Sequence, residues 1–263
     1  MSVLCVVGDV TAVIQLHDVV YVVCQWSSTI TRFNATTRQP LMDINVKDLR
    51  APDDIVACEQ TSQLYVAGDW ECVWRVSSDG TDIKHWLPKS PDDTFKPSKL
   101  SVTSTRLLVT SRYIRQLRQF DADGDELRRV QLPDHMRPQH AVESPTGTFI
   151  VSLNNTQLKQ YQVVEVNTGG EVLCQFSGLR LISLGYTPDV AVDSHGNIFV
   201  SDRGNRHILL LDNHLSLRRV IIDEHQLNYN EQPRRLCYRE DKGQLLVSFW
   251  FSGRVTVFDV LCR

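Results

Sequence analysis

The sequence predicts an all-β protein folded as a six-bladed β-propeller with four-stranded antiparallel blades. Three observations predict this fold. Six short apolar segments recur at a nearly constant spacing, turn residues recur at matching places between them, and one apolar segment at the N-terminus is left over. A repeat of about 40–50 residues with four strands per unit is typical of propeller blades.

The repeat is clearest in the apolar segments themselves, which read DVVYVVCQ, QLYVAGD, RLLVTSR, TFIVSLN, NIFVSDR and QLLVSFW. Each is short and rich in β-branched residues, which is typical of buried strands. Their spacings run from 42 to 49 residues, measured between the central valines Val22, Val66, Val109, Val151, Val200 and Val247. The chain therefore divides into six similar units.

The fifth unit shows the expected order of strands within a blade. Its apolar segments PDVAVDS, NIFVSDR, RHILLLD and LSLRRVII are separated by short turns that contain Gly, Asn or Asp. Such residues tolerate the backbone conformations of tight hairpins. We expect one domain over residues 1–263, with blades at about 10–48, 52–90, 97–134, 137–178, 187–223 and 232–260.

The last unit supplies only three strands, whereas the chain begins with the apolar segment SVLCVVG. An open ring would expose two large sheet faces to water, so closure by the chain ends is favoured. We therefore expect residues 2–8 to form the fourth strand of the last blade.

Composition restricts the class of protein. The 263 residues are 42% hydrophobic and 22% charged, which is typical of a folded globular chain. The net charge of −3 gives no general attraction to nucleic acid or to an anionic membrane. Seven scattered cysteines without a CxxC pair, and no apolar run of membrane-spanning length, predict a cytoplasmic protein without disulfides, membrane contact, metal or cofactor.

Residues 187–212, TPDVAVDSHGNIFVSDRGNRHILLLD, resemble an NHL repeat. Asp202, Asn205 and Ile208 match the Asp-x-x-Asn-x-Arg-Ile loop of that repeat, while His207 stands where the repeat has Arg. The other five units match in length and strand order more than in motif. Independently of the resemblance, Asp and Asn in a turn hydrogen-bond nearby backbone groups, so we expect a structural role for this motif.

The turns between second and third strands emerge on one face of a propeller, and this loop face is the expected binding surface. Aromatic and arginine side chains are enriched there, as they are in binding hot spots. The candidate partner-binding residues are Trp26, Trp70, Arg112, Tyr113, Arg115, Arg203, Arg206, Trp250 and Phe251.

These residues favour a non-catalytic module, expected to be monomeric, that binds a protein or peptide. The resemblance implies a propeller of the kind that selects targets in tripartite-motif ubiquitin ligases. Single-stranded RNA is the second hypothesis, since cations and aromatics occur together and some NHL propellers bind RNA on this face. A metal-dependent hydrolase or lyase is the third, but the acids of the expected inner strands lie mostly at the turn end, and His140 is a lone histidine.

Overall fold

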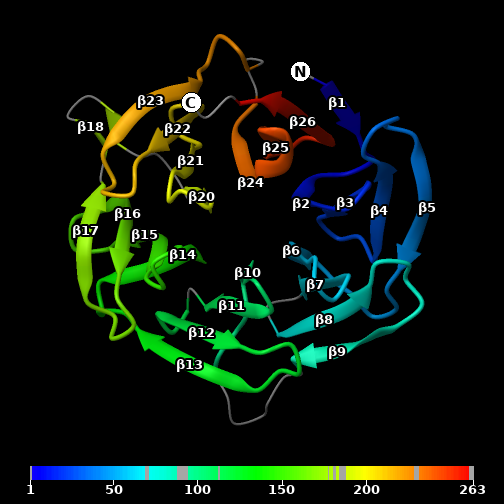
Figure 1. Ribbon diagram of the computed structural model, residues 1–263, viewed down its shortest axis with the longest axis horizontal. Helices are drawn as coiled ribbons and strands as arrows, with labels where there is room; N and C mark the ends of the chain where they lie inside the picture. Colours follow the sequence, from blue (N-terminus) through cyan, green and yellow to red (C-terminus); the bar gives the residue numbers. More distant parts are fainter. Residues whose placement is uncertain are drawn as a thin grey trace.

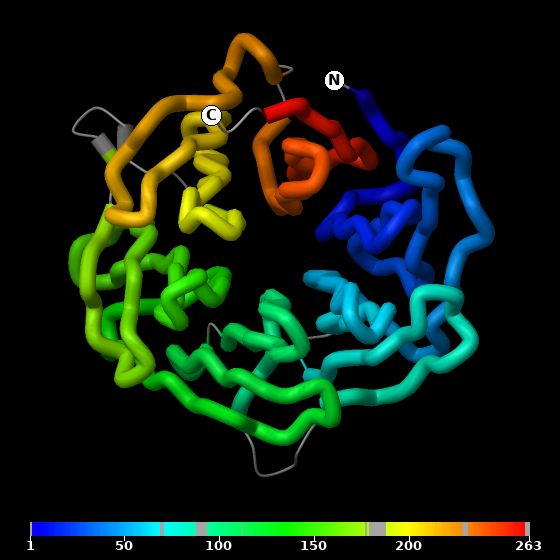
Figure 2. Tube along the Cα trace, in the orientation of Figure 1, coloured from blue at the N-terminus to red at the C-terminus, as the bar shows by residue number. Residues whose placement is uncertain are grey.

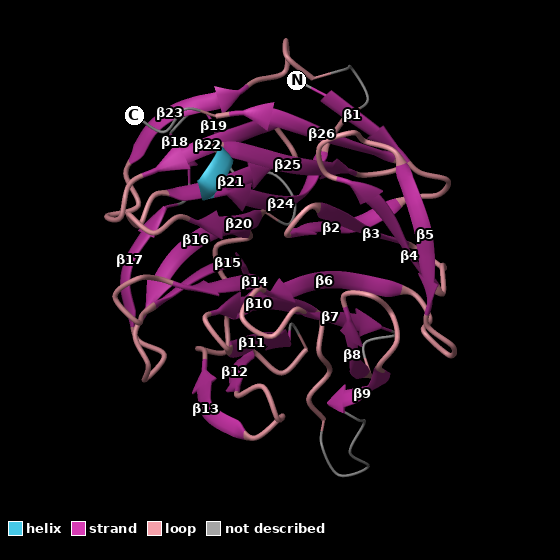
Figure 3. Ribbon diagram, turned by 45° about the vertical axis from the view of Figure 1, so that its right-hand side comes forward, coloured by secondary structure: helices cyan, strands magenta, loops and turns pink. Residues whose placement is uncertain are grey.

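The computed structural model describes residues 2–68, 71–87, 94–111, 113–176, 178–179, 182–183, 188–227 and 231–260. Six four-stranded antiparallel sheets stand around a central axis (Figure 1). This arrangement is a six-bladed β-propeller and confirms the fold class predicted from the repeats. Almost all of the regular structure is strand (Figure 3).

Each blade runs from an inner strand at the axis to an outer strand at the rim. Blade 1 contains β2 (Val10–Leu16), β3 (Val19–Cys24), β4 (Thr29–Asn34) and β5 (Pro40–Asn45). Blade 2 contains β6 (Pro52–Cys58), β7 (Gln63–Gly68), β8 (Cys72–Ser77) and β9 (Ile83–Leu87). Blade 3 contains β10 (Lys99–Thr103), β11 (Arg106–Ser111), β12 (Gln116–Phe120) and β13 (Glu126–Gln131).

The second half of the ring repeats this order. Blade 4 contains β14 (Met136–Glu143), β15 (Phe149–Asn155), β16 (Gln160–Val166) and β17 (Val172–Phe176). Blade 5 contains β20 (Asp189–Val192), β21 (Ile198–Asp202), β22 (His207–Leu211) and β23 (Leu217–Ile222). Blade 6 contains β24 (Pro233–Arg239), β25 (Gln244–Phe249), β26 (Arg254–Asp259) and β1 (Ser2–Cys5).

The N-terminal strand closes the ring, as the strand count predicts. Strand β1 pairs antiparallel with β26 on the rim of blade 6, with Ser2 opposite Val257 and Cys5 opposite Arg254 (Figure 2). The strand ends at Cys5 rather than near residue 8, because the following segment crosses from blade 6 to blade 1.

This crossing segment forms the closure seam between the two blades. The Val6 N–H donates to the Gly253 carbonyl at 2.6 Å, and the Val10 N–H donates to the Ser252 carbonyl at 3.0 Å. A Cβ atom at Gly253 would lie only 2.1 Å from the Val6 carbonyl oxygen. Glycine at this position therefore permits the close approach that closes the ring.

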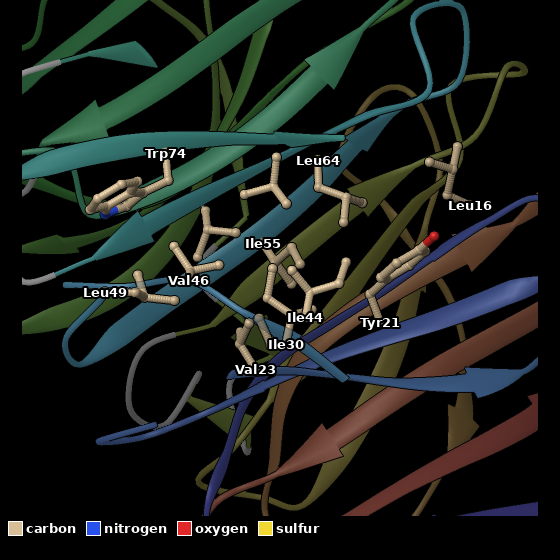
Figure 4. Packing of buried hydrophobic residues seen from close by; sticks show 13 residues of the cluster. Leu16, Tyr21, Val23, Ile30, Ile44, Val46, Leu49, Ile55, Leu64 and Trp74 are labelled. Atoms are coloured by element: carbon tan, nitrogen blue, oxygen red, sulfur yellow. The ribbon is translucent and has the colours of Figure 1, made fainter. Parts of the chain in front are cut away.

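Apolar clusters hold neighbouring blades together. The cluster between blades 1 and 2 includes Ile30, Ile44, Leu64 and Trp74, all buried (Figure 4). Five further clusters occupy the other interfaces between blades, including the one between blades 6 and 1. The core is thus distributed around the ring, and the closure interface is packed like the others.

Two small elements were not predicted from the sequence. A two-stranded ribbon of β18 (Gly178–Leu179) and β19 (Ile182–Ser183) lies between blades 4 and 5, and a short 3₁₀ helix spans Glu240–Lys242 in blade 6. None of the described residues forms an apolar helix of the length that a bilayer crossing needs.

Candidate functional site

The turns between second and third strands share an unusual backbone conformation. Five of their residues have positive φ angles, namely Trp26 (63°), Arg115 (55°), Lys159 (52°), Arg206 (57°) and Phe251 (54°). Bulky side chains rarely adopt this region. Because basic and aromatic residues occupy it alike, the blade geometry sets the turn conformation but does not explain why two of these residues are aromatic.

Large apolar side chains are exposed on both sides of the closure seam. Val7 is 99% exposed, Trp26 79% and Phe251 76%. The turns that carry Trp26 and Phe251 are both hydrogen-bonded to the crossing segment. The Gln25 N–H donates to the Asp9 carbonyl at 2.8 Å, and the Val10 N–H donates to the Ser252 carbonyl at 3.0 Å. We call Val7, Trp26 and Phe251 the seam patch.

Two of the predicted binding arginines are paired with acidic residues. Arg115 Nη2 lies 3.1 Å from Asp134 Oδ1, and Arg206 Nη2 lies 2.8 Å from Glu224 Oε2. Such exposed pairs add little stability. They do reduce the positive charge that the loop face offers to a polyanion.

Tyr113 is about half exposed, and the Lys96 ammonium lies 5.8 Å from the centre of its ring. Two further predicted binding residues, Trp70 and Arg112, lie outside the described residues. Among the predicted residues, the structure brings Trp250 and Phe251 into contact, with their ring centres 6.0 Å apart.

Two guanidinium groups lie against the ring of Trp250. The Cζ atom of Arg203 is 4.2 Å from the ring centre, and that of Arg234 is 3.9 Å away. Arg203 Nε also donates to Gln232 Oε1 at 2.9 Å. These cation–π contacts leave little of the Trp250 ring for a nucleic-acid base to stack on.

A central channel runs along the axis of the ring. A small pocket of about 70 Å³ lies at the end of this channel on the loop face and is lined in part by Trp250. The residues that start the inner strands form its wall, because the inner strands run from this face toward the opposite one. The lining includes Asp53, Lys99, Gln139, Pro188, Arg234 and Trp250. We call this pocket the channel mouth below.

The repeat motif of blade 5 forms a hydrogen-bonded turn. Asn205 donates from its backbone N–H to Asp202 Oδ1 at 3.2 Å and from Nδ2 to Asp202 Oδ2 at 2.6 Å. Asp202 is buried. His207 follows as the first residue of β22, paired with Asp202 across the hairpin. These contacts hold the turn in place.

Below the mouth, four polar side chains meet on the axis, one from each of four inner strands. Arg235 Nη1 lies 2.9 Å from Asp189 Oδ1, and Arg235 Nε lies 2.8 Å from Asp54 Oδ1. His140 Nδ1 is 2.9 Å from the same Asp189 oxygen. Arg235 Nη2 also donates to the Leu100 carbonyl at 3.0 Å. We call Asp54, His140, Asp189 and Arg235 the channel plug.

All four plug side chains are buried. Burial opposes ionisation of Asp189, but the charges of Arg235 and His140 outweigh it and lower the pKa of this carboxyl well below its usual range. Burial also opposes the charge of Arg235, but Asp189 and Asp54 outweigh it and raise the pKa of the guanidinium. The plug is therefore a buried ionic cluster in which one guanidinium pairs with two carboxylates.

The plug corrects the sequence-based expectation that the inner strands carry no convergent polar set and that His140 stands alone. Its members occupy one register position, opposite Ala67, Ser152, Ser201 and Ser248 of the second strands. Each follows a proline by one or two residues, at Pro52, Pro138, Pro188 and Pro233. The proline that precedes each plug residue by one or two positions was the feature of the sequence that related these four residues to one another.

On the far side of the plug, the channel widens to a cavity of about 460 Å³ that continues into a hollow of about 670 Å³ at the opposite face. The wall of the cavity is mostly apolar, with Val56, Val102 and Leu236 among its residues. Within the described part of the chain, no three His, Cys, Asp or Glu residues are grouped closely enough to hold a metal ion.

Comparisons with known proteins identify the fold only. No protein-family model matches the chain, and no curated protein matches it in sequence. A solved structure of hydrazine synthase from Kuenenia stuttgartiensis superposes with a TM-score of 0.70 at 15% identity, covering 97% of this chain and 84% of that one. A protein of unknown function from Bacteroides caccae superposes with a TM-score of 0.64 at 15% identity, covering 87% and 81%. The chain is thus similar to these proteins in its propeller-like architecture.

Proposed function

We propose that this propeller is a non-catalytic interaction module that binds a protein or peptide on its loop face. The supporting observation is the seam patch, in which Trp26 and Phe251 are both more than three-quarters exposed. The turns that carry these two residues are hydrogen-bonded to the same crossing segment. Large apolar side chains exposed in one region of a surface mark interaction sites, and aromatic residues dominate binding energy in such sites. Neither the core nor the turn geometry requires aromatic residues at these two positions.

The proposal includes the NHL-type assignment and, with it, a role in selecting targets for a ubiquitin-ligase assembly. The match of residues 187–212 to the repeat supports it, together with the Asp202–Asn205 turn that this motif forms. The propeller scaffold suits such a role, because its turns present side chains from separate repeats on one surface.

Single-stranded RNA is the second candidate, since arginines and aromatics share the loop face. The charge pairing on the loop face favours a protein over RNA as the partner. Arg115 and Arg206 are paired with acids, and the ring of Trp250 is occupied by two guanidinium groups.

A displayed random-peptide library tests the proposal. Peptides are selected on the wild-type protein and then measured on the double variant Trp26→Gly/Phe251→Gly, since glycine adopts both φ angles freely. We expect at least a tenfold loss of affinity, which corresponds to about 1.4 kcal/mol.

The control is Met42→Ser, which removes a side chain that is 82% exposed on the outer strand β5, away from the loop face. Peptides should bind this variant as they bind the wild type. Failure to select any peptide, or equal loss in both variants, would count against the proposal. Binding of a labelled uridine oligomer at low salt, lost in the double variant, would favour RNA instead.

A further inference from the structure

Arg234 at the channel mouth has hydrogen-bond donors that the protein leaves unused. A guanidinium has five N–H donors. The described residues accept one hydrogen bond from it, at the Val10 carbonyl, 3.2 Å from Nη1. No described carboxylate lies within ion-pair distance of Arg234, although the next residue, Arg235, contacts two.

The Arg234 side chain is held in place without being neutralised. Its hydrogen bond to Val10 crosses the seam to blade 1, and its Cζ atom lies 3.9 Å from the centre of the Trp250 ring. A fixed guanidinium loses little conformational entropy when it binds a planar anion, and it can bind a carboxylate through two parallel N–H···O bonds.

Charged side chains of both signs face the mouth. Lys99 and Asp53 offset one another, with Nζ 3.7 Å from Oδ1. Burial is the largest influence on the pKa of Arg234 and lowers it, whereas the charges of Asp53, Asp9 and Asp54 raise it and that of Arg203 lowers it. Asp189 also lines the pocket, so its charged side chains balance one another. Arg234 is therefore marked by its unused hydrogen-bond donors and not by a net charge of the pocket.

The size and position of the mouth restrict the ligand. About 70 Å³ admits the tip of a side chain, whereas pockets for whole small molecules are several times larger. Trp250 lines the mouth and contacts Phe251 of the seam patch. A chain segment that covers the seam patch therefore passes next to the mouth.

We infer that the channel mouth binds a carboxylate of the partner, namely an Asp or Glu side chain of the segment that covers the seam patch, with Arg234 as the residue that receives it. The inference rests on the proposed function and specifies its ligand as an acidic peptide. The unused Arg234 donors, the fixed position of this side chain and the small volume of the pocket carry it.

Two measurements test this inference. First, peptides from a displayed library are selected separately on the wild type, on Arg234→Met, and on the control Arg218→Met, which removes the same charge from an exposed position on the outer strand β23. We expect enrichment of Asp or Glu at one position with the wild type and the control, but not with Arg234→Met. Replacing that acid by its amide should weaken binding to the wild type about 10–100-fold and leave binding to Arg234→Met almost unchanged.

Second, the arginine Nε–H signals of the labelled wild-type protein are followed by NMR while sodium acetate, sodium phosphate or sodium chloride is added at matched ionic strength. Acetate should shift the Arg234 signal, and chloride should not. The melting temperature of each variant shows whether a loss of binding comes from a loss of folding. The Arg234→Lys variant keeps the positive charge but cannot form the bidentate hydrogen bonds of a guanidinium.

The outcomes distinguish the inference from the proposed function. Selected peptides that need the seam patch but show no acidic preference, with no acetate shift, overturn the inference and leave the proposed function standing. An acetate shift without any selected peptide supports the carboxylate site and contradicts the proposed function. A shift with phosphate but not with acetate overturns the inference in favour of a nucleic-acid backbone.

Discussion

Arg234 and Arg235 are consecutive residues of β24, yet they lie in two very different regions of the molecule. Arg235 enters the channel plug, where Asp54 and Asp189 neutralise it. Arg234 turns to the channel mouth, where one backbone carbonyl accepts from it and no described carboxylate pairs with it. The same residue type is thus part of the interior in one case and of the candidate binding surface in the other.

The difference shows how a β-bulge near the start of an inner strand separates stability from recognition. The pairing of β24 with β25 skips Arg234, because Pro233 lies opposite Phe249 and Arg235 opposite Ser248. A bulge of this kind redirects a side chain, so adjacent residues meet different surroundings. The plug joins strands β6, β14, β20 and β24 across the axis. Arg234 makes one hydrogen bond and one ring contact within the fold, whereas Arg235 joins two buried carboxylates. Variants of the mouth and of the seam patch should therefore change binding more than stability.

The largest effect is expected from Arg235→Met. This change leaves the buried carboxylates of Asp54 and Asp189 without their cation, which typically costs about 3–5 kcal/mol. Urea unfolding at neutral pH measures the loss. A change below about 1 kcal/mol, the scale of exposed ion pairs, would mean that the plug is not the ionic centre described here.

A smaller loss is expected from Gly253→Ala at the closure seam. The new Cβ would lie 2.1 Å from the Val6 carbonyl oxygen, so the crossing segment must move. Overpacking of this kind costs about 1–3 kcal/mol. Thermal unfolding measures it, with Gly147→Ala as a comparison at a turn glycine whose added Cβ meets no atom within 4 Å, although its φ of 82° adds strain of its own. Equal losses in the two variants would argue against tight closure at Gly253.

The acid dependence of stability should change in Asp189→Asn. Because the folded-state pKa of Asp189 is lowered, its carboxylate stabilises the fold above the unfolded-state pKa, and this stabilisation is lost as the pH falls toward the folded-state value. One such group contributes at most about 1.4 kcal/mol per pH unit below about pH 4. Urea unfolding at pH 5, 4 and 3 should show a smaller slope for the variant. An identical slope would show that Asp189 has an ordinary pKa.

The smallest effect on stability is expected from Trp26→Gly/Phe251→Gly. Exposed substitutions usually change the free energy of unfolding by no more than about 0.5 kcal/mol, and glycine removes the strain of two positive φ angles. The melting temperature should therefore stay the same or rise. A clear fall would show that the seam patch packs against the fold and is not a free surface.

The repeat, the blade order and the closing strand could be predicted because each rests on a local pattern. Apolar strands, turn residues and an unpaired segment such as SVLCVVG are visible within a few residues of sequence. The plug could not be predicted in this way. Asp54, His140, Asp189 and Arg235 come from four repeats, and the proline that precedes each by one or two residues does not show that their side chains meet.

The loop face was only partly predictable for a related reason. The turn positions follow from the repeat, which placed Trp26 and Phe251 correctly on this face. The pairing of Arg206 with Glu224, and the stacking of Arg203 and Arg234 on Trp250, depend on side chains from separate turns and strands. Arg234 was missed because it lies on an inner strand rather than in a turn.

The most direct test compares Arg234→Met with Arg235→Met in the same two assays, unfolding by urea and binding of a selected acidic peptide. We expect Arg234→Met to lose at most about 1–2 kcal/mol of stability, from one hydrogen bond and one cation–π contact, and at least tenfold in peptide affinity. Arg235→Met should instead lose about 3–5 kcal/mol of stability. An Arg234→Met protein that binds the acidic peptide as tightly as the wild type would contradict the separation between plug and mouth.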